Sequence, residues 1–404
     1  MRCEPMDIRQ EEVTTLHEIC ANKEKLISSI RDVSVERPVS IIMPMLYREL
    51  ENKSIDGIVK GLNKCDYVRD IIIPLSAQSE KEFSHVKRFF SKLQKKPLII
   101  WCNGPHVTRL LEELKQDGIN VVDYEGKGRD VWLAFGIASL RSYAIALHDA
   151  DIQTYSEMIP AKLLFPILEP ELDFKFSKGY YARVNLEKNI IYGRVFRLFV
   201  HPLLKAFVDE LGYEPNFLSF LRAFRYPLSG EFAMTVDVAI DVDVPGDWGI
   251  EIGVLAEIYR NVAWKRICQI DLGFYEHKHQ KMGGRKTGLV RMARDIFQTL
   301  LKVLTEEDHI QFSEPFLTSL QVVYQRVARD CIRQYHADAV FNGLNYDRHL
   351  EETIVERFSR HMLESGRVYL QKPTGTRIPD WLRTISARRK MREELFEIVL
   401  EENE

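Results

Sequence analysis

The stretch Ala144–Asp151 (AIALHDAD) is an apolar run that ends in two aspartates, Asp149 and Asp151, two positions apart. A short apolar run bounded by charge is typical of a buried parallel strand, and open α/β sheets build their sites at the carboxyl ends of such strands. Two ionised carboxylates there repel each other unless a positive charge lies between them. The pair therefore indicates a divalent cation carrying a diphosphate, because Mg²⁺ is usually held by one or two carboxylates and substrate phosphates. The alternative is an ordinary strand-end turn with solvated aspartates.

Three further loops follow predicted strands and carry groups that suit a nucleotide. Pro44–Glu49 contains a carboxylate that can hold a ribose or a base, and Pro74–Ala77 is a small polar loop of the same kind. Each could equally be a plain connection from a strand to a helix. Gly126–Arg129 opens a predicted helix, where glycines let the backbone approach a ligand and Lys127 supplies a positive charge for a diphosphate. The spacing of a P-loop, G-x-x-x-x-G-K-[ST], is absent.

Two downstream segments suit an anion and a metal ion. Tyr192–Arg197 opens a predicted amphipathic helix, Val195–Leu211, so that backbone amides and Arg194 would form an anion site. The alternative is a solvated helix start. His277 and His279 share one face of an extended segment, and one imidazole could complete the coordination of a cation held by an aspartate. The alternative for each histidine is a structural or exposed position.

The elements that must position these residues alternate between strand and helix from residue 39 to residue 149. The predicted strands are Val39–Leu46, Val68–Leu75, Pro97–Asn103, Ile119–Val122 and Ala144–Asp149. The predicted helices between them are Ser54–Leu62, Glu80–Leu93, Val107–Leu114 and Asp130–Leu140. Such alternation requires crossover connections, so we expect an α/β fold with a mostly parallel sheet of the nucleotide-binding type.

The pattern is looser after residue 151 and almost wholly helical after residue 312. The further predicted elements are a hairpin over Asp173–Asn185 with its turn at Lys178-Gly179, helices Trp248–Arg260 and Leu289–Leu304, and an extended segment Val262–Tyr275. Residues 1–37 look helical, charged and superficial. In the C-terminal helices, apolar residues at helical spacing suit either dimerisation or packing on the same chain, as at Leu317, Leu320, Val323 and Val327.

Composition restricts the class of protein. The 404 residues are 45% apolar and 28% charged, with a net charge of −3, which suits an ordinary globular chain and argues against a nucleic-acid binder. The six cysteines show neither C-x-x-C nor other paired spacing, so they fit a reducing compartment. The N-terminus lacks the apolar core of a secretion signal, and no apolar run is long enough for a membrane span. We expect a cytoplasmic protein that contacts no membrane.

The segments occur in the order seen in a known family. The chain resembles retaining glycosyltransferases of the GT-A fold, and within them the glucosyl-3-phosphoglycerate synthases, over roughly Val39–Leu304. The matching motifs are P-x-L-x-x-E at Pro44–Glu49, G-K-G-x-x-x-W at Gly126–Trp132, D-x-D at Asp149–Asp151, G-R-V-x-x-L-x-x-x-P-L-L at Gly193–Leu204, P-L-x-G-E at Pro227–Glu231, G-[VI]-E-I-G at Gly249–Gly253, and Q-[VI]-[ND]-L-G…H-[KR] at Gln269–Lys278. Seven motifs in order, with sensible gaps, are hard to produce by chance.

The resemblance implies which residues hold the donor nucleotide. Pro44, Leu46 and Glu49 match the loop that holds the base and ribose, and Ser76 matches a further uridine or ribose contact. Lys127 matches the lysine near the donor nucleotide. The donor is then a nucleotide diphospho-sugar, either UDP- or GDP-glucose or GDP-mannose, because the sequence fixes neither base nor sugar.

The resemblance also implies the catalytic and metal-binding residues. Asp149 matches a sugar-nucleotide contact, and Asp151 matches a ligand of Mg²⁺ or Mn²⁺, with His277 as its distant partner. Glu251 matches the carboxylate close to the reacting sugar. We expect the cation to stabilise the charge that develops on the leaving diphosphate, with Lys127 adding to that field.

The sugar and acceptor sites follow in the same way. Gly230 and Glu231 resemble the wall of the sugar pocket, and Gly193 and Arg194 resemble the acceptor phosphate site. The family commonly has a threonine after G-R-V whose hydroxyl helps to bind the acceptor phosphate, whereas this chain has Phe196.

A second departure follows the metal histidine. The family tends to read H-[RK]-N-R, whereas Lys278 is followed here by His279 and Gln280, so an arginine near the acceptor is missing. Lys281 or Arg285 could substitute for it. Both departures fall on the acceptor side, so the donor half of the pattern is kept better than the acceptor half.

The predicted function is metal-dependent, retaining transfer of glucose or mannose to 3-phosphoglycerate or a related small acidic acceptor, as in the synthesis of glucosylglycerate-type compatible solutes. One alternative is a sugar-phosphate nucleotidyltransferase, which usually has a glycine-rich basic loop after the first strand. The other is a non-catalytic nucleotide-sugar-binding scaffold. We divide the chain into an N-terminal segment (1–37), a transferase domain (38–304, with a nucleotide-sugar half 38–151 and an acceptor half 152–304) and a helical extension (305–404), and expect a homodimer.

Overall fold

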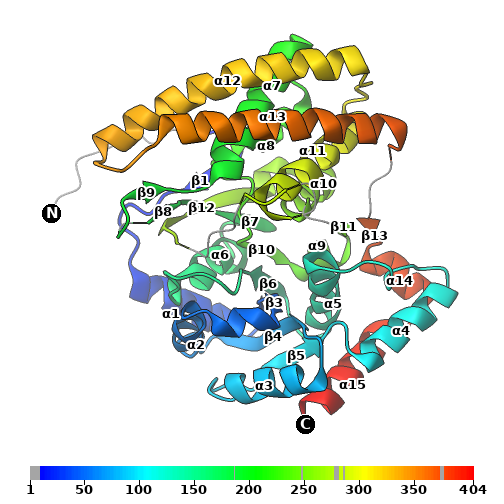
Figure 1. Cartoon of the computed structure of the whole chain (residues 1–404). Helices are drawn as coiled ribbons and strands as arrows, with labels where there is room; N and C mark the ends of the chain where they lie inside the picture. The colour runs from blue at the N-terminus through cyan, green and yellow to red at the C-terminus, as the bar shows by residue number, and fades with distance from the viewer. Residues whose placement is uncertain (1–9, 186, 247–248, 277–281, 285–286, 374–376) are drawn as a thin grey trace.

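A nine-stranded, mostly parallel sheet forms the centre of the chain (Figure 1). The computed structural model describes residues 10–185, 187–246, 249–276, 282–284, 287–373 and 377–404. The strand order is β1-β12-β7-β10-β6-β2-β4-β3, with β5 also paired to β4; β10 is antiparallel to β6 and β7, and the other pairs of this sheet are parallel. The strands are β1 (Thr14–Leu16), β2 (Val39–Ile42), β3 (Met45–Leu46), β4 (Val68–Ser76), β5 (Leu98–Trp101), β6 (Ala144–Leu147), β7 (Phe176–Ala182), β10 (Phe232–Thr235) and β12 (Ile267–Phe274).

The central strands are buried because both faces of the sheet are covered. Every residue of β2 and β6 is buried, as parallel sheets with helices on both sides require. Val39 and Ile41 pack into the core on one face, whereas Ile42 packs into the core on the other. The predicted α/β fold with a mostly parallel sheet is confirmed.

Helices form a layer on each face of the sheet. One face is covered by α1 (Lys23–Ser34), α2 (Ser54–Leu62), α3 (Glu80–Phe90) and α6 (Met158–Leu168). The core on the other face is shared by α4 (Pro105–Gln116), α5 (Lys127–Ser139), α7 (His201–Leu211), α8 (Asn216–Ala223), α9 (Val236–Ile240), α10 (Ile250–Asn261) and α11 (Gly288–Glu307), and it continues into the C-terminal helices.

The C-terminal helices reach both ends of the molecule (Figure 1). The long helices α12 (Glu314–Phe341) and α13 (Arg348–Gln371) lie side by side and pack on α7 and α11. The chain then passes through β13 (Arg377–Ile378), which pairs with β11 (Val244–Pro245), into α14 (Trp381–Ala387) and α15 (Met391–Asn403). The buried Asn403 side chain accepts from Ile99 N at 3.2 Å and donates to Ile99 O at 2.8 Å, which fastens α15 to strand β5.

Two predicted strand features are wrong. Ile119–Val122 forms no strand: Ile119 and Val121 are buried in the core, so their apolar pattern reports packing without strand pairing. The hairpin predicted over Asp173–Asn185 does not form: strand β7 runs straight through the predicted turn and is paired on both sides. Gly179 lies within this strand and allows the Leu272 side chain to approach the backbone closely, because an added Cβ would lie 2.4 Å from Leu272 Cδ1. A short hairpin follows it, formed by β8 (Val184–Asn185) and β9 (Ile190–Ile191).

The N-terminal end of the chain also differs in part from expectation, whereas the C-terminal helices agree with one of the two alternatives. The N-terminal segment contains helix α1 but also strand β1, which extends the sheet beside β12. Among the apolar positions of α12, Leu317, Leu320 and Val327 are buried in the core of their own chain. No helix in the described ranges has the length and apolar character that crossing a membrane requires.

Candidate active site

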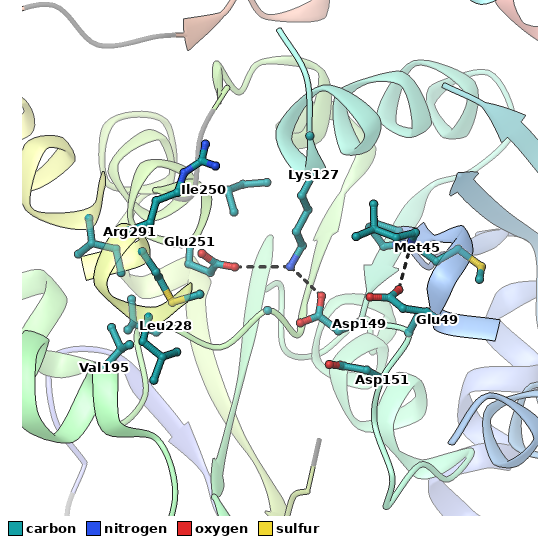
Figure 2. Close-up of a pocket in the computed structure, with 18 of the residues that line it drawn as sticks. Met45, Glu49, Lys127, Asp149, Asp151, Val195, Leu228, Ile250, Glu251 and Arg291 are labelled. Atoms are coloured by element: carbon teal, nitrogen blue, oxygen red, sulfur yellow. Dashed lines mark hydrogen bonds and ion pairs between the residues drawn. The ribbon is translucent and has the colours of Figure 1, made fainter. Parts of the chain in front are cut away.

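A pocket of about 370 Å³ opens where the predicted donor loops meet (Figure 2). Its lining comes from the ends of β2, β6 and β7, the start of α5, the segments before α7 and β10, and the N-terminal parts of α10 and α11. The predicted residues in the lining are Pro44, Leu46, Glu49, Lys127, Asp149, Asp151, Gly193, Arg194, Gly230 and Glu251. The fold therefore brings together segments that lie more than 200 residues apart in the sequence, from Pro44 to Glu251.

Lys127 stands between two carboxylates at the centre of the pocket (Figure 2). Its Nζ donates to Asp149 Oδ1 at 2.7 Å and approaches Glu251 Oε1 at 3.5 Å. Lys127 is the first residue of α5, after Gly126 with φ +121°, and Glu251 lies in the first turn of α10. Asp149 follows β6, which ends at Leu147. Two helix starts and one strand end thus converge on one ammonium group.

The carboxylates around Lys127 favour a cation in the pocket. Burial, together with the charges of Asp149 and Glu49, raises the pKa of Asp151 to about 8. Burial also raises the pKa of Glu49, although its Oε2 accepts from Leu46 N at 3.2 Å. Burial opposes the charge of Lys127, yet the facing carboxylates raise the pKa of its ammonium group.

A hard divalent cation fits the carboxylate oxygens of Glu49, Asp149 and Asp151 in this lining, and a bound cation would let Asp151 ionise. The described residues contain no group of three or more side chains able to hold a metal ion by themselves. The predicted second ligand, His277, lies outside the described residues. The pairing of Asp151 with His277 therefore stays a prediction.

Ser76 is linked to the pocket by a residue that the sequence did not single out. Ser76 is not in the pocket lining, but its Oγ donates to Asp130 Oδ2 at 2.7 Å, and Asp130 does line the pocket. Burial raises the pKa of Asp130. The spacing could have revealed it, because Asp130 lies three residues after Lys127 and so one helical turn along α5.

The predicted sugar wall is divided between a lining residue and a supporting one. Gly230 lines the pocket, and an added Cβ would lie 2.9 Å from Asp149 Oδ2, so a side chain there would collide with the aspartate. Glu231 is buried behind it and accepts hydrogen bonds from Tyr181 at 2.8 Å and from Tyr275. Lys178 Nζ donates to Ser229 O at 2.7 Å and fixes the same loop.

The opposite side of the pocket carries arginines. Arg194 lines it and lies 3.5 Å, Nε to Oε1, from the buried Glu351 of α13. Sequence reasoning missed Arg183, Tyr226 and Arg291, which also line the pocket. No local motif marked them, although Tyr226 directly precedes the P-L-S-G-E segment. Lys281 and Arg285, the suggested substitutes for a missing arginine, lie outside the described residues.

Comparison with known proteins decides the family. No family model matches the chain. The chain is 48% identical over 395 residues to the glucosyl-3-phosphoglycerate synthase of Methanococcoides burtonii, covering 97% of each chain. It is 39% identical to that of Persephonella marina, covering 94% of each. This chain belongs to the glucosyl-3-phosphoglycerate synthase family. The predicted resemblance is confirmed, and the protein is a glycosyltransferase.

Solved structures agree with the fold of this synthase family. The glucosyl-3-phosphoglycerate synthase of Mycobacterium tuberculosis, in complex with Mn²⁺, UDP-glucose and phosphoglyceric acid, matches with a TM-score of 0.53 and 20% identity, covering 75% of this chain and 89% of that chain. The mannosyl-3-phosphoglycerate synthase of Rubrobacter xylanophilus matches with a TM-score of 0.54 and 21% identity, covering 74% and 83%. Both matches show the GT-A fold of this synthase family in the present chain.

Proposed function

We propose that this chain transfers glucose from UDP-glucose to 3-phosphoglycerate, with retention of configuration and with Mg²⁺ or Mn²⁺ as cofactor. The two relatives that match nearly the whole chain carry the name of this activity, and the M. tuberculosis structure contains UDP-glucose and phosphoglyceric acid, which supports uridine as the base and glucose as the sugar.

The observation that carries the proposal is the separation of charge across the pocket. Among the described lining residues before position 152, five are acidic and two basic, which suits a metal–diphosphate. Among those after it, three are arginines and one is a glutamate, which suits an anionic acceptor. The lining arginines of the second group are Arg183, Arg194 and Arg291.

The residues of the donor side would hold the leaving group. Asp151, with His277 as its predicted partner, would hold the divalent cation, and Glu49 would bind the ribose or base. The bound cation supplies positive charge that offsets the negative charge developing on the diphosphate. Lys127 adds a fixed positive charge at the same place, held there by Asp149 at 2.7 Å.

The transfer itself requires no nucleophile from the protein. The bond from the anomeric carbon to the diphosphate oxygen breaks, and the acceptor hydroxyl oxygen bonds to the same face of that carbon. The hydroxyl proton passes to the departing phosphate oxygen. Glu251, fixed 3.5 Å from Lys127 Nζ, orients the sugar or the acceptor hydroxyl and does not attack.

The test is a transfer assay with purified protein, Mg²⁺ or Mn²⁺ and 3-phosphoglycerate, in which UDP-glucose, GDP-glucose and GDP-mannose are compared as donors. We expect an α-linked glucosyl product from UDP-glucose and no turnover with a chelator or with Asp151→Ala. Absence of transfer from every donor, with nucleotide binding retained, would favour the scaffold alternative. Pyrophosphate release from UTP and glucose 1-phosphate would favour the nucleotidyltransferase alternative.

The proposal also covers the location of the protein, its oligomeric state and the roles of its segments. We propose a cytoplasmic homodimer in which residues 38–151 bind the donor, residues 152–304 bind the acceptor and residues 305–404 support the acceptor side. Exposed apolar side chains on α12, among them Val322, Val340 and Phe341, are compatible with a dimer. Light scattering in solution decides the oligomeric state.

A further inference from the structure

The acceptor side has lost the hydroxyl that the family places after G-R-V. Phe196 occupies that position, and its ring packs on the rings of Tyr226, at 4.9 Å between centroids, and His201, at 5.8 Å. A phenyl ring donates no hydrogen bond, so the side chain of Phe196 cannot take the part of the threonine hydroxyl in binding a phosphate. Another donor must do so if the acceptor is a phosphomonoester.

Arg183 and Tyr226 lie at the place where that donor is needed. Arg183 Nη1 donates to the Tyr226 hydroxyl at 2.9 Å, and both residues line the pocket. A Cβ added to Gly193 would lie 3.6 Å from Arg183 Cδ and 3.7 Å from the Tyr226 hydroxyl. The pair therefore sits against Gly193, next to Arg194, in the predicted phosphate site.

The chemistry of the pair suits phosphate. A guanidinium carries five N–H donors in a planar fork, so it can bind the tyrosine oxygen and phosphate oxygens at once. The Tyr226 hydroxyl accepts from Arg183, which leaves its own proton to donate to a phosphate oxygen. The aromatic rings of Phe196 and Tyr181, the latter 5.0 Å from the Tyr226 ring, keep water from one side of the pair and strengthen such hydrogen bonds.

The backbone connects Arg183 and Tyr226 to the segments that line the predicted phosphate and sugar sites. Arg183 directly follows β7, and its backbone oxygen accepts from Tyr192 N at 2.8 Å, which ties it to the segment that carries Gly193. Tyr226 begins the loop whose Gly230 lines the sugar wall. A contact from this pair to the acceptor would thus set the distance between the acceptor and the donor sugar.

We propose that Arg183 and Tyr226 bind the phosphate of the acceptor and so determine specificity for a phosphorylated three-carbon acid. This inference rests on the proposed function, and it assigns to the pair the part that a threonine hydroxyl plays in the family pattern. Arg194 completes the site as a third donor.

The test measures binding and kinetics of Tyr226→Phe and Arg183→Gln. We expect Tyr226→Phe to weaken 3-phosphoglycerate about tenfold, in KM and in calorimetric Kd, while the KM for UDP-glucose stays within about twofold, because a lost hydrogen bond to a charged group has that size. We expect Arg183→Gln to weaken it further. Two variants outside the pocket lining provide controls: Tyr180→Phe, on the same strand as Tyr181, and Arg225→Gln, next to Tyr226.

The possible outcomes of these measurements can be told apart. An unchanged Kd for 3-phosphoglycerate in Tyr226→Phe, or an equal loss in the two control variants, overturns the proposal. If Arg183→Gln fails to fold, Tyr226→Phe decides alone, because it removes only a hydroxyl group. If the unaltered protein binds 3-phosphoglycerate but transfers no glucose, the proposed function fails while the binding comparison still decides this inference. If it does not bind 3-phosphoglycerate at all, both fail.

Discussion

Arg197 and Glu351 form a two-pronged ion pair, with Nη1 donating to Oε2 at 2.8 Å and Nη2 donating to Oε1 at 3.2 Å, across 154 residues of sequence. Both side chains are buried. The same carboxylate lies 3.5 Å from Nε of Arg194, which lines the acceptor side of the pocket. Helix α13 of the C-terminal extension therefore positions an arginine of the candidate active site.

Removing this carboxylate should affect both stability and the acceptor. We expect Glu351→Ala to lower the free energy of unfolding by about 3–5 kcal/mol, because it leaves the buried Arg197 charge without its partner. We also expect a higher KM for the acceptor, because Arg194 loses its support. Urea denaturation measures the first effect, with the exposed Glu356→Ala as control. A loss no larger than that of the control would contradict this account.

Lys127→Met should separate catalysis from folding. Its ammonium group bridges Asp149 and Glu251, so we expect kcat to fall about 10²–10³-fold, the size found when one preorganised donor to a developing anion is removed. Methionine keeps much of the length and volume of the lysine chain, which preserves packing at the start of α5. Steady-state kinetics with a thermal melt checks this, with Lys115→Met, an exposed surface ion pair, as control. Kinetics equal to those of the unaltered protein would rule out the assigned role.

The fold could be predicted because the sequence patterns of its strands and helices are local and alternate regularly along the chain. Runs such as Ile71–Leu75 are continuously apolar, which is the pattern of strands covered on both faces, and this run forms the buried part of β4. The rule that sites form at the carboxyl ends of parallel strands placed Asp149 after β6 correctly, whereas Lys127 reaches it from the start of α5, because the strand predicted before this helix does not form. The family pattern supplied Glu251, which no local rule places beside them.

The missed features depend on contacts between distant segments. Lys178-Gly179 resembles a turn in sequence, but Gly179 is needed because the side chain of Leu272, 93 residues later, leaves no room for a Cβ. Arg183 and Tyr226 have no shared motif, and their hydrogen bond arises only when β7 and the loop before β10 pack together. Sequence spacing describes one element at a time, so pairs of this kind appear only once the fold is known.

Gly128→Ala should strongly destabilise the protein for a packing reason, although it lies in the G-K-G motif. A Cβ at Gly128 would lie 1.9 Å from Pro245 O, a backbone atom of β11 that cannot simply move aside. We therefore expect a loss of more than about 3 kcal/mol, as in severe overpacking. Gly57→Ala is the matched control: nothing lies within 4 Å of its added Cβ in α2, so we expect a gain of about 0.5–1 kcal/mol. Chemical denaturation of both variants gives the comparison, and equal effects would refute it.

The stability of the chain should fall on mild acidification, in part through His201 at the start of α7. Burial, followed by the positive charges of Lys205 and Arg222, lowers the pKa of His201 to about 4, below the value near 6.5 of an unfolded histidine. Between pH 6.5 and 4 the unfolded chain binds this proton more readily than the folded chain, so the free energy of unfolding decreases as the pH falls through that window.

The ring of His201 packs beside Phe196 and Tyr335 and is not part of the pocket lining. His201→Gln should therefore flatten the dependence of stability on pH in that window, whatever its effect at neutral pH. Unfolding curves of both proteins at pH 7.5, 6 and 4.5 measure the two slopes, and parallel slopes would show that His201 keeps an ordinary pKa in the folded chain.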